Sequence, residues 1–187
     1  MSGRKEFSSY TINAQDQIVS VNRSWQEFAD SNGATNIDGD QELGHSVWHY
    51  ITGAEVRQLY EMLFDGVRRK RRAVTVPFRC DAPDRRRFME LQVTPGSTDG
   101  ALVVSCVTLR EEERDGAPLF AETDPDPDKL LKVCSWCKHI EMDDDWVEVE
   151  EATQRLNLFA ARRLPRLTHG ICPQCAALVR EQVSRED

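Results

Sequence analysis

Four cysteines in the last third of the chain have the type and spacing of a metal site. They form two Cys-x-x-Cys pairs, Cys134 with Cys137 and Cys172 with Cys175. Each such turn places two thiolates on one side of a short loop, and two turns supply the four ligands of a closed tetrahedral zinc site. Because complete coordination leaves no position for water or substrate, the spacing predicts one structural zinc ion per chain.

Three alternatives to a four-cysteine zinc site stay open. An iron–sulfur cluster also accepts four thiolates, and spacing alone does not distinguish it from zinc. His169, or with less support His139, could replace one thiolate, although the Thr-His-Gly setting of His169 suits a turn or a supporting hydrogen bond better. A redox dithiol switch is disfavoured, because a thioredoxin-type site has one such pair at a helix start and not two.

The composition is that of a globular protein with an acidic balance. Of 187 residues, 40% are apolar and 30% charged, and the formal net charge is −8. Phosphate affinity comes from accumulated Lys and Arg, so nucleic acid is a disfavoured partner. No stretch approaches the roughly 18 apolar residues of a membrane span, and Met1 to Tyr10 lacks an apolar core. We therefore expect a cytoplasmic protein without a membrane partner, where paired cysteines favour metal over disulfides.

An acidic, proline-bearing stretch predicts a division of the chain into two domains. Residues 113–129 contain the run Thr123-Asp-Pro-Asp-Pro-Asp128 and show no hydrophobic periodicity, which is typical of a linker. The predicted first domain therefore covers residues 1–112, and the predicted second domain covers residues 130–187.

The first domain has the pattern of two strands, a group of helices and three further strands. Apolar residues recur at spacings of three and four around Trp25 and again from Val56 to Val67, which predicts helices with one buried face. The predicted strands cover residues 8–13, 17–21, 74–80, 89–94 and 101–109. Apolar and polar residues alternate in the third and fourth strands, which predicts an antiparallel sheet with one wetter face. Pro77 cannot donate to a ladder, so its strand should lie at the sheet edge.

This order of elements resembles the PAS (Per-Arnt-Sim) sensory domain. The residues that carry the resemblance are Ile18-Val-Ser-Val-Asn22 leading into Trp25, Leu43-Gly-His-Ser-Val-Trp48 and Val103-Val-Ser-Cys-Val-Thr-Leu-Arg110. The resemblance implies an α+β fold, with a five-stranded antiparallel sheet in the order 2-1-5-4-3 and helices on one face. It also implies that the domain binds a small molecule between sheet and helices, or dimerises and relays a signal.

Six residues are candidates to line a PAS ligand pocket: Trp25, His45, Trp48, His49, Tyr60 and Phe64. Aromatic residues at helical spacing are first of all core residues, so the ligand stays unidentified. Haem would need an axial histidine, and His45 and His49 are the only candidates in the helical region. Haem is disfavoured, because histidines beside a Trp more often pack or face solvent. Cys80 and Cys106 lie in predicted strands, where a buried cysteine is usually a small apolar residue.

The second domain resembles a zinc-binding tail found on bacterial PAS and receiver-domain proteins. The matching residues are Cys134-Ser-Trp-Cys-Lys-His-Ile140, Trp146 and Thr168-His-Gly-Ile-Cys-Pro-Gln-Cys175. Residues 138–171 separate the cysteine pairs, which is more than the roughly 15 to 20 residues of a compact zinc ribbon. This insertion predicts a short amphipathic helix from Val149 to Phe159, and a closing helix should follow the second pair. Together they predict a small zinc-knuckle α/β module.

No catalytic motif emerges, so the sequence favours a non-enzymatic signalling protein. Its first domain would sense a ligand or form a homodimer, and its zinc module would present a surface to a protein partner. One alternative is a transcription-related regulator that binds nucleic acid through Arg155, Arg162, Arg163, Arg166 and Arg180. The other is a redox or metal sensor that releases zinc on oxidation. Two basic runs, Arg68 to Arg72 and Arg85 to Arg87, are interpreted as solvated surface.

Overall fold

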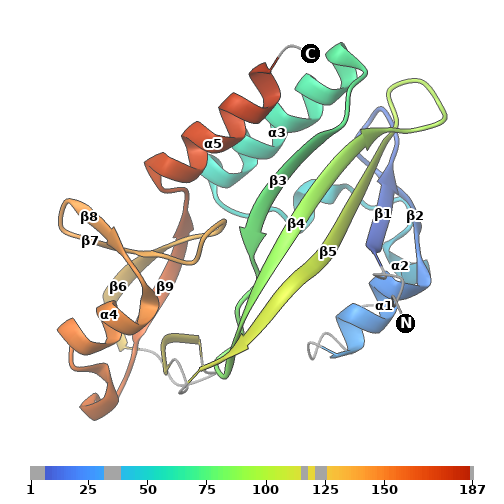
Figure 1. The fold of residues 1–187 in the computed structure, drawn as a ribbon. Helices are drawn as coiled ribbons and strands as arrows, with labels where there is room; N and C mark the ends of the chain where they lie inside the picture. Colours follow the sequence, from blue (N-terminus) through green and yellow to red (C-terminus); the bar gives the residue numbers. More distant parts are fainter. Residues whose placement is uncertain (1–6, 32–38, 115–117, 121–125, 186–187) are drawn as a thin grey trace.

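The computed structural model describes residues 7–31, 39–114, 118–120 and 126–185, and a five-stranded antiparallel sheet organises its first part (Figure 1). The strand order is β2-β1-β5-β4-β3. The strands are β1 (Ser8–Ile12), β2 (Ile18–Val21), β3 (Val74–Arg79), β4 (Arg85–Pro95) and β5 (Leu102–Glu113). The α+β class and the order 2-1-5-4-3 are therefore confirmed, and the fold is PAS-like. The strand that carries Pro77 lies at the sheet edge, as predicted.

In the described part of the connection from β2 to β3 there are four helical segments, and the last of them packs on the inner face of the sheet. They are α1 (Arg23–Ser31), α2 (Gly39–Glu42), the 3-10 turn η1 (Val47–His49) and α3 (Ala54–Lys70). The apolar stripe of α3 includes Leu63, Phe64 and Val67, each at most 1% exposed. Because these residues recur every three or four positions, one face of α3 meets the inward side chains of the strands, such as Val76 and Val93.

A second, four-stranded sheet forms the rest of the chain, in the order β8-β7-β6-β9. Its strands are β6 (Asp126–Cys134), β7 (Ile140–Met142), β8 (Asp145–Val147) and β9 (Pro165–Gly170). The 3-10 turn η2 (Pro118–Phe120) precedes β6, and α4 (Val149–Arg155) and η3 (Leu158–Ala160) lie between β8 and β9. Helix α5 (Pro173–Ser184) follows β9. The helix predicted from Val149 to Phe159 is in fact two segments, because Asn157 adopts a left-handed conformation with φ of 51°.

Regular structure extends into the stretch interpreted as a linker. Strand β5 continues to Glu113 and β6 begins at Asp126, while residues 115–117 and 121–125 lie outside the described residues. Strand β6 pairs with β9 at Asp126, and the register then shifts before pairing resumes at Leu130. Pro127 lies in this irregular part, which is consistent with its lack of a backbone N–H for a ladder. The predicted domain boundaries themselves stay a prediction.

Helix α5 lies beside α3 and over β3, so the two parts share one buried core (Figure 1). Val179 and Val183 of α5 belong to the same apolar cluster as Val74 and Val76 of the first sheet. The helices approach closely at Gly66, where an added Cβ would lie 2.4 Å from Cγ1 of Val183. Close contact at this position therefore depends on the absence of a side chain.

A Gly66→Ala variant should test this close approach. Alanine is favoured over glycine in a helix interior by about 1 kcal/mol, so helix propensity alone would stabilise the variant. Overpacking a tight contact costs about 1–3 kcal/mol, and here the neighbour Val183 is itself buried. We expect a net loss of about 1 kcal/mol in the free energy of unfolding, measured by urea denaturation. The control is Ala54→Gly at the exposed start of α3, which measures the effect of helix propensity without a change in packing. Gly96→Ala is unsuitable as a control, because an added Cβ at Gly96 would also be crowded.

The basic run at the end of α3 does more than face solvent. Lys70 and Arg72 donate to backbone carbonyls at the end of α5, including those of Ser184 and Gln182. Arg68 forms an ion pair with Asp16 at 2.6 Å. The carbonyls at a helix C-terminus carry partial negative charge and lack intrahelical partners, so these cations satisfy them. The interpretation of this run as solvated surface is therefore wrong for the half-buried Arg68 and Arg72, whereas Lys70 is exposed.

A cluster of ion pairs joins the β3–β4 hairpin to the start of α4. The Asp81 carboxylate is fully buried and accepts hydrogen bonds from Arg79 and Arg114. Arg79 also donates to both oxygens of Glu148 at 2.9 Å, and Arg114 contacts Glu150 at 3.2 Å. Arg86, from the run interpreted as solvated, binds the same Glu150 at 2.7 Å. Buried charges are tolerated only when paired, so this cluster requires both parts of the chain.

The cluster makes stability depend on pH. Burial acts to raise the pKa of Glu148, but hydrogen bonds from Arg79 outweigh it, and the net pKa lies below its ordinary value of 4.5. A carboxyl whose pKa is depressed on folding stabilises the protein above its unfolded pKa and loses that contribution as the pH falls below it. We expect the stability advantage over a Glu148→Gln variant to shrink as the pH drops through and below 4.5, measured by thermal unfolding. An advantage that stays constant over this range would contradict the prediction.

Candidate metal centre

Parallel pairing of β6 with β9 brings the two cysteine pairs together. The register sets Val133 opposite His169 and Cys134 opposite Gly170, so both strands end at the same edge of the sheet. The first pair occupies the turn after β6, and the second pair follows β9 at the start of α5. The two Cys-x-x-Cys turns are therefore adjacent although residues 138–171 separate them in the sequence.

Backbone hydrogen bonds fix each turn. In the first, the Cys134 N–H donates to the His139 carbonyl at 2.8 Å, and Lys138 adopts a left-handed conformation that lets the chain reverse. In the second, Cys172 is the N-cap of α5 and Pro173 occupies the first helical turn, where its missing N–H costs nothing. Cys172 and Cys175 thus lie at a helix N-terminus, whose partial positive charge favours thiolates.

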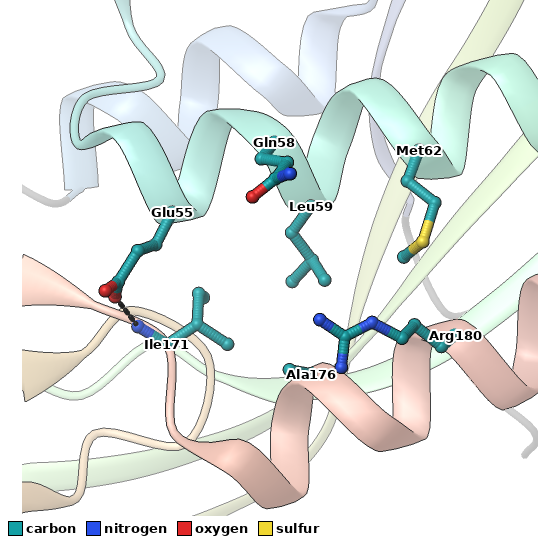
Figure 2. Close-up of a pocket in the computed structure, with 7 residues that line it drawn as sticks. All are labelled: Glu55, Gln58, Leu59, Met62, Ile171, Ala176 and Arg180. Carbon is teal, nitrogen blue, oxygen red and sulfur yellow. Dashed lines mark hydrogen bonds between the residues drawn. The ribbon is translucent and has the colours of Figure 1, made fainter.

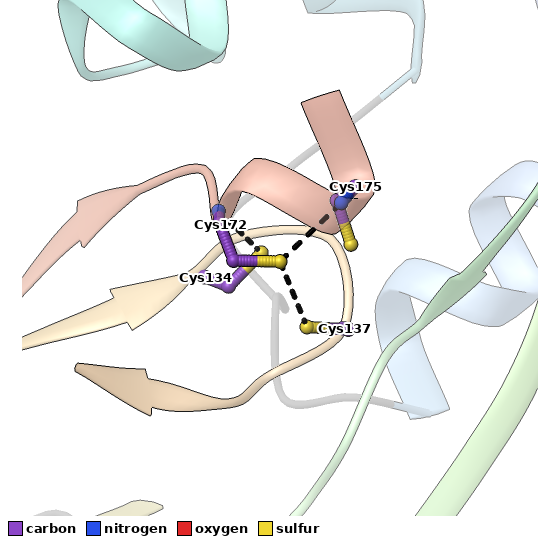
Figure 3. Close-up of side chains that lie close together, drawn as sticks. All are labelled: Cys134, Cys137, Cys172 and Cys175. Carbon is purple, nitrogen blue, oxygen red and sulfur yellow. Dashed lines mark hydrogen bonds between the residues drawn. The ribbon is translucent and has the colours of Figure 1, made fainter. Parts of the chain in front are cut away.

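The four Sγ atoms lie within 4.8 Å of one another and converge on one point (Figure 3). Those of Cys137 and Cys172 are 3.7 Å apart. A tetrahedral ion with metal–sulfur bonds of about 2.3 Å would separate its ligands by about 3.8 Å, so this spacing fits a single ion. Backbone N–H groups also donate to sulfur at 3.4 Å, from Cys172 to Cys134 and from Cys175 to Cys172. The residues present therefore fit a four-thiolate metal site.

Mutual contact makes the thiols unequal when they compete for protons. Hydrogen bonds from Cys137 and Cys175 hold the pKa of Cys134 well below its usual range. The same hydrogen bond to Cys134 raises the pKa of Cys137 to about 12, and bonds to Cys134 and Cys137 raise the pKa of Cys175. Four adjacent thiols thus cannot all become thiolates unless a cation compensates their charge, which is what a bound metal ion supplies.

The surroundings of the thiols include one cation and several buried rings. Lys138 donates to the Ser135 carbonyl at 2.9 Å and lies near enough to Cys134 to interact with its charge. Burial is the main cause that lowers the pKa of Lys138. Trp136, between the first two cysteines, is 3% exposed and contacts the rings of Tyr60 and Phe78. The thiols are therefore enclosed by both parts of the chain.

The two nearby histidines do not join the cysteine cluster. Among the described residues, the group of potential ligands comprises the four cysteines alone. His139 faces the Glu148 carboxylate, with 3.2 Å between Nε2 and Oε1, and His169 is exposed. Cys80 directly follows β3 and Cys106 lies in β5, and burial raises the pKa of Cys106 to about 12. Both stand apart from the metal site.

The six residues predicted to line a PAS pocket are only partly brought together. Trp48, Tyr60 and Phe64 form a ring cluster, with centroids 5.6 and 5.7 Å from Phe64. The Trp48 indole donates to Asp16 at 3.0 Å, and Phe64 is 1% exposed, so these rings act as core. His45 and His49 are exposed, with ring centroids 6.2 Å apart. Trp25 lies on α1 and makes no ring contact with the others in the described part of the chain.

Sequence reasoning missed the residues that connect the metal centre to the first sheet. The Trp136 indole donates to the Pro77 carbonyl at 2.7 Å, and the Arg79 N–H donates to the Trp136 carbonyl at the same distance. Arg79 is a charged residue in the alternating strand β3, but it is only 7% exposed. The apolar character of Trp136 inside a Cys-x-x-Cys turn is the signal that could have indicated a buried contact.

No protein-family model matches the chain, and no curated protein matches it. One similar solved structure is a domain of an HTR-like protein from Haloarcula marismortui, with 15% sequence identity and a TM-score of 0.42. The match covers 56% of this chain and 98% of that domain. Within the described ranges, no helix is both long and apolar enough to cross a membrane.

Proposed function

We propose that this protein is a non-enzymatic signalling protein in which a PAS-like sensory domain acts on a zinc-held module. The sensory domain would bind a ligand or form a homodimer, and the module would present a surface to a protein partner. The observation that carries the proposal is that Cys134, Trp136 and Cys172 belong to the same buried cluster as the first sheet. A change in the sheet or in α3 would therefore reach the metal centre through packed side chains.

Zinc is the metal that the donor set favours. Four thiolates in a closed tetrahedron are typical of structural zinc, which has no redox chemistry of its own. The spread of at most 4.8 Å suits one ion, whereas a cluster of several irons would hold its thiolates farther apart. Elemental analysis and an absorption spectrum of the purified chain test this choice. One zinc per chain without visible absorbance supports it, whereas a brown colour with bound iron would show that the site holds iron and not zinc.

The coupling of the two parts is tested by hydrogen exchange of the full chain with and without metal. If the module and the sensory domain act together, chelation should raise exchange in α5 and also in the contacting parts of α3 and β3. If the module is an independent appendage, only residues 126–185 should change. The second result would remove the proposed relay and leave the metal site intact.

Partners of the module are tested separately. Light scattering of the full chain distinguishes a homodimer from a monomer. The nucleic-acid alternative relies on arginines that the structure distributes over α4, the segment between η3 and β9, β9 itself and α5. Arg155 among them pairs with Glu151 on its own helix. Salt-sensitive retention of the full chain on a nucleic-acid column would favour that alternative. Flow-through at low salt would leave the protein partner or the homodimer.

A further inference from the structure

A cavity of about 460 Å³ lies between α3 and α5 (Figure 2). This volume falls within the range of about 300–1,000 Å³ that is usual for small-molecule sites. Seven residues line it: Glu55, Gln58, Leu59 and Met62 from α3, and Ile171, Ala176 and Arg180 from α5 and the residue preceding its N-cap. None of the six residues predicted to line a PAS ligand pocket is among them, so this site is distinct from the predicted pocket.

The inner wall of the cavity is apolar. Leu59 is 5% exposed at its base, and the half-buried side chains of Met62, Ile171 and Ala176 surround that base. Ala176 is small, which keeps α5 from filling the space opposite α3. An apolar wall of this kind favours a hydrocarbon chain, because each methylene that leaves water gains free energy.

Arg180 extends from α5 into the cavity (Figure 2). It forms no ion pair with any carboxylate in the part of the chain that the structure describes, whereas Arg72 and Arg185 nearby are engaged at helix ends. A guanidinium presents paired N–H donors that match the two oxygens of a carboxylate. Gln58 on α3 adds an amide to the cavity wall that faces Arg180.

Glu55 sets the polarity of the other end. Its carboxylate accepts a hydrogen bond from the Ile171 N–H at 3.1 Å and lies 3.9 Å from the Lys132 ammonium. One end of the cavity therefore carries an unpaired cation and the other end an anion, with apolar side chains between them. A ligand with a single negative charge matches this arrangement, and a second carboxylate at the far end would be repelled.

We propose that this cavity binds a free monocarboxylic acid with a short unbranched hydrocarbon chain. The carboxylate pairs with Arg180, and the chain lies on Leu59, Met62 and Ile171. Because the cavity is formed by one helix of the sensory part and one helix of the metal-held part, the ligand contacts both. The site goes beyond the proposed function and does not depend on the identity of the metal.

Methionine-methyl NMR of the full, metal-loaded chain tests the site. The sequence has four methionines, of which Met62 lines the cavity, Met89 is buried in the first sheet and Met142 lies in β7. Titration with acetate, butanoate, hexanoate and octanoate should move the Met62 signal alone. Affinity should rise by up to roughly fourfold per added methylene. Octanol and octanedioate should bind more weakly than octanoate.

Two variants separate the charge from the shape of the site. Arg180→Gln should weaken octanoate binding by about tenfold or more, and Arg166→Gln, which removes an exposed arginine from β9, should not. Ala176→Leu should block binding while keeping Arg180. Circular dichroism and metal content establish that each variant is folded. The proposal is overturned if no acid in the series moves Met62, or if octanol binds as tightly as octanoate. If the zinc content is unchanged in that case, the cavity proposal fails while the proposed function is unaffected.

Discussion

A Cys172→Ala variant is expected to lose its metal and at least about 4 kcal/mol of stability, a loss large enough to unfold residues 126–185. Metal binding to structural four-ligand sites contributes on the order of 10–16 kcal/mol, which is comparable to the whole stability of a domain. Cys172 is 1% exposed and also caps α5, whose Val179 and Val183 complete the common core. Removing this ligand therefore acts on the metal site, on the helix and on the packing against α3.

The measurement is thermal unfolding of the full chain together with its metal content. Cys80→Ala is the matched control, because Cys80 lies outside the four-sulfur cluster and is only half-buried. It should keep one metal ion per chain and lose little stability. Chelation of the native protein should reproduce the Cys172→Ala result. A variant that keeps its metal and its unfolding temperature would show that Cys172 is not a ligand.

A Trp136→Ala variant is expected to lose about 3–5 kcal/mol, because it empties the space between the metal centre and the first sheet. The indole is 3% exposed, its ring centroid lies 5.4 Å from that of Tyr60, and its N–H donates to the Pro77 carbonyl. Trp136 lies between Cys134 and Cys137 but is not itself a candidate metal ligand. The metal content should therefore stay at one ion per chain while the two parts separate.

Trp136→Phe is the control for this prediction. It keeps a ring in the core and removes the hydrogen bond to Pro77, so it should cost only about 1–2 kcal/mol. Urea unfolding gives the free energies, and hydrogen exchange reports whether β3 loses protection. If Trp136→Ala changes the free energy of unfolding by less than 1 kcal/mol, the contact does not join the two parts.

The local patterns in the sequence predicted the first sheet because they act over short distances. Alternation in β3 and β4 and the missing donor of Pro77 are properties of neighbouring residues; the first indicates an antiparallel sheet and the second an edge position. The strand order itself was implied by the resemblance to the PAS domain. The spacing within each cysteine pair is equally local. Convergence of the pairs was inferred from the chemistry of four thiolates, and the distances within 4.8 Å agree with it.

The contacts between the two parts were not predictable, because they join residues far apart in the sequence. Val179 and Val183 show helical spacing, but that spacing does not reveal that Gly66 is the opposing surface. Arg79 is a charged residue in a strand whose apolar and polar residues alternate, which is typical of an exposed position. It is buried because Glu148 and Trp136, far away in the sequence, contact it. The parallel pairing of β6 with β9 likewise depends on partners separated by a whole α-helical crossover.

The contact of Trp136 with β3 has a consequence for the behaviour of the protein in concentrated solution. An edge strand offers unpaired N–H and C=O groups to any other chain, which makes it a site of intermolecular strand addition. On β3, Pro77 lacks a backbone N–H, so one such donor is absent. The Pro77 carbonyl accepts a hydrogen bond from the Trp136 indole, and the Arg79 N–H donates one to the Trp136 carbonyl. The Cys134–Cys137 turn thus shields the end of this strand from self-association. A chain without metal would keep much of its first sheet but expose this edge, so metal loss would appear first as aggregation.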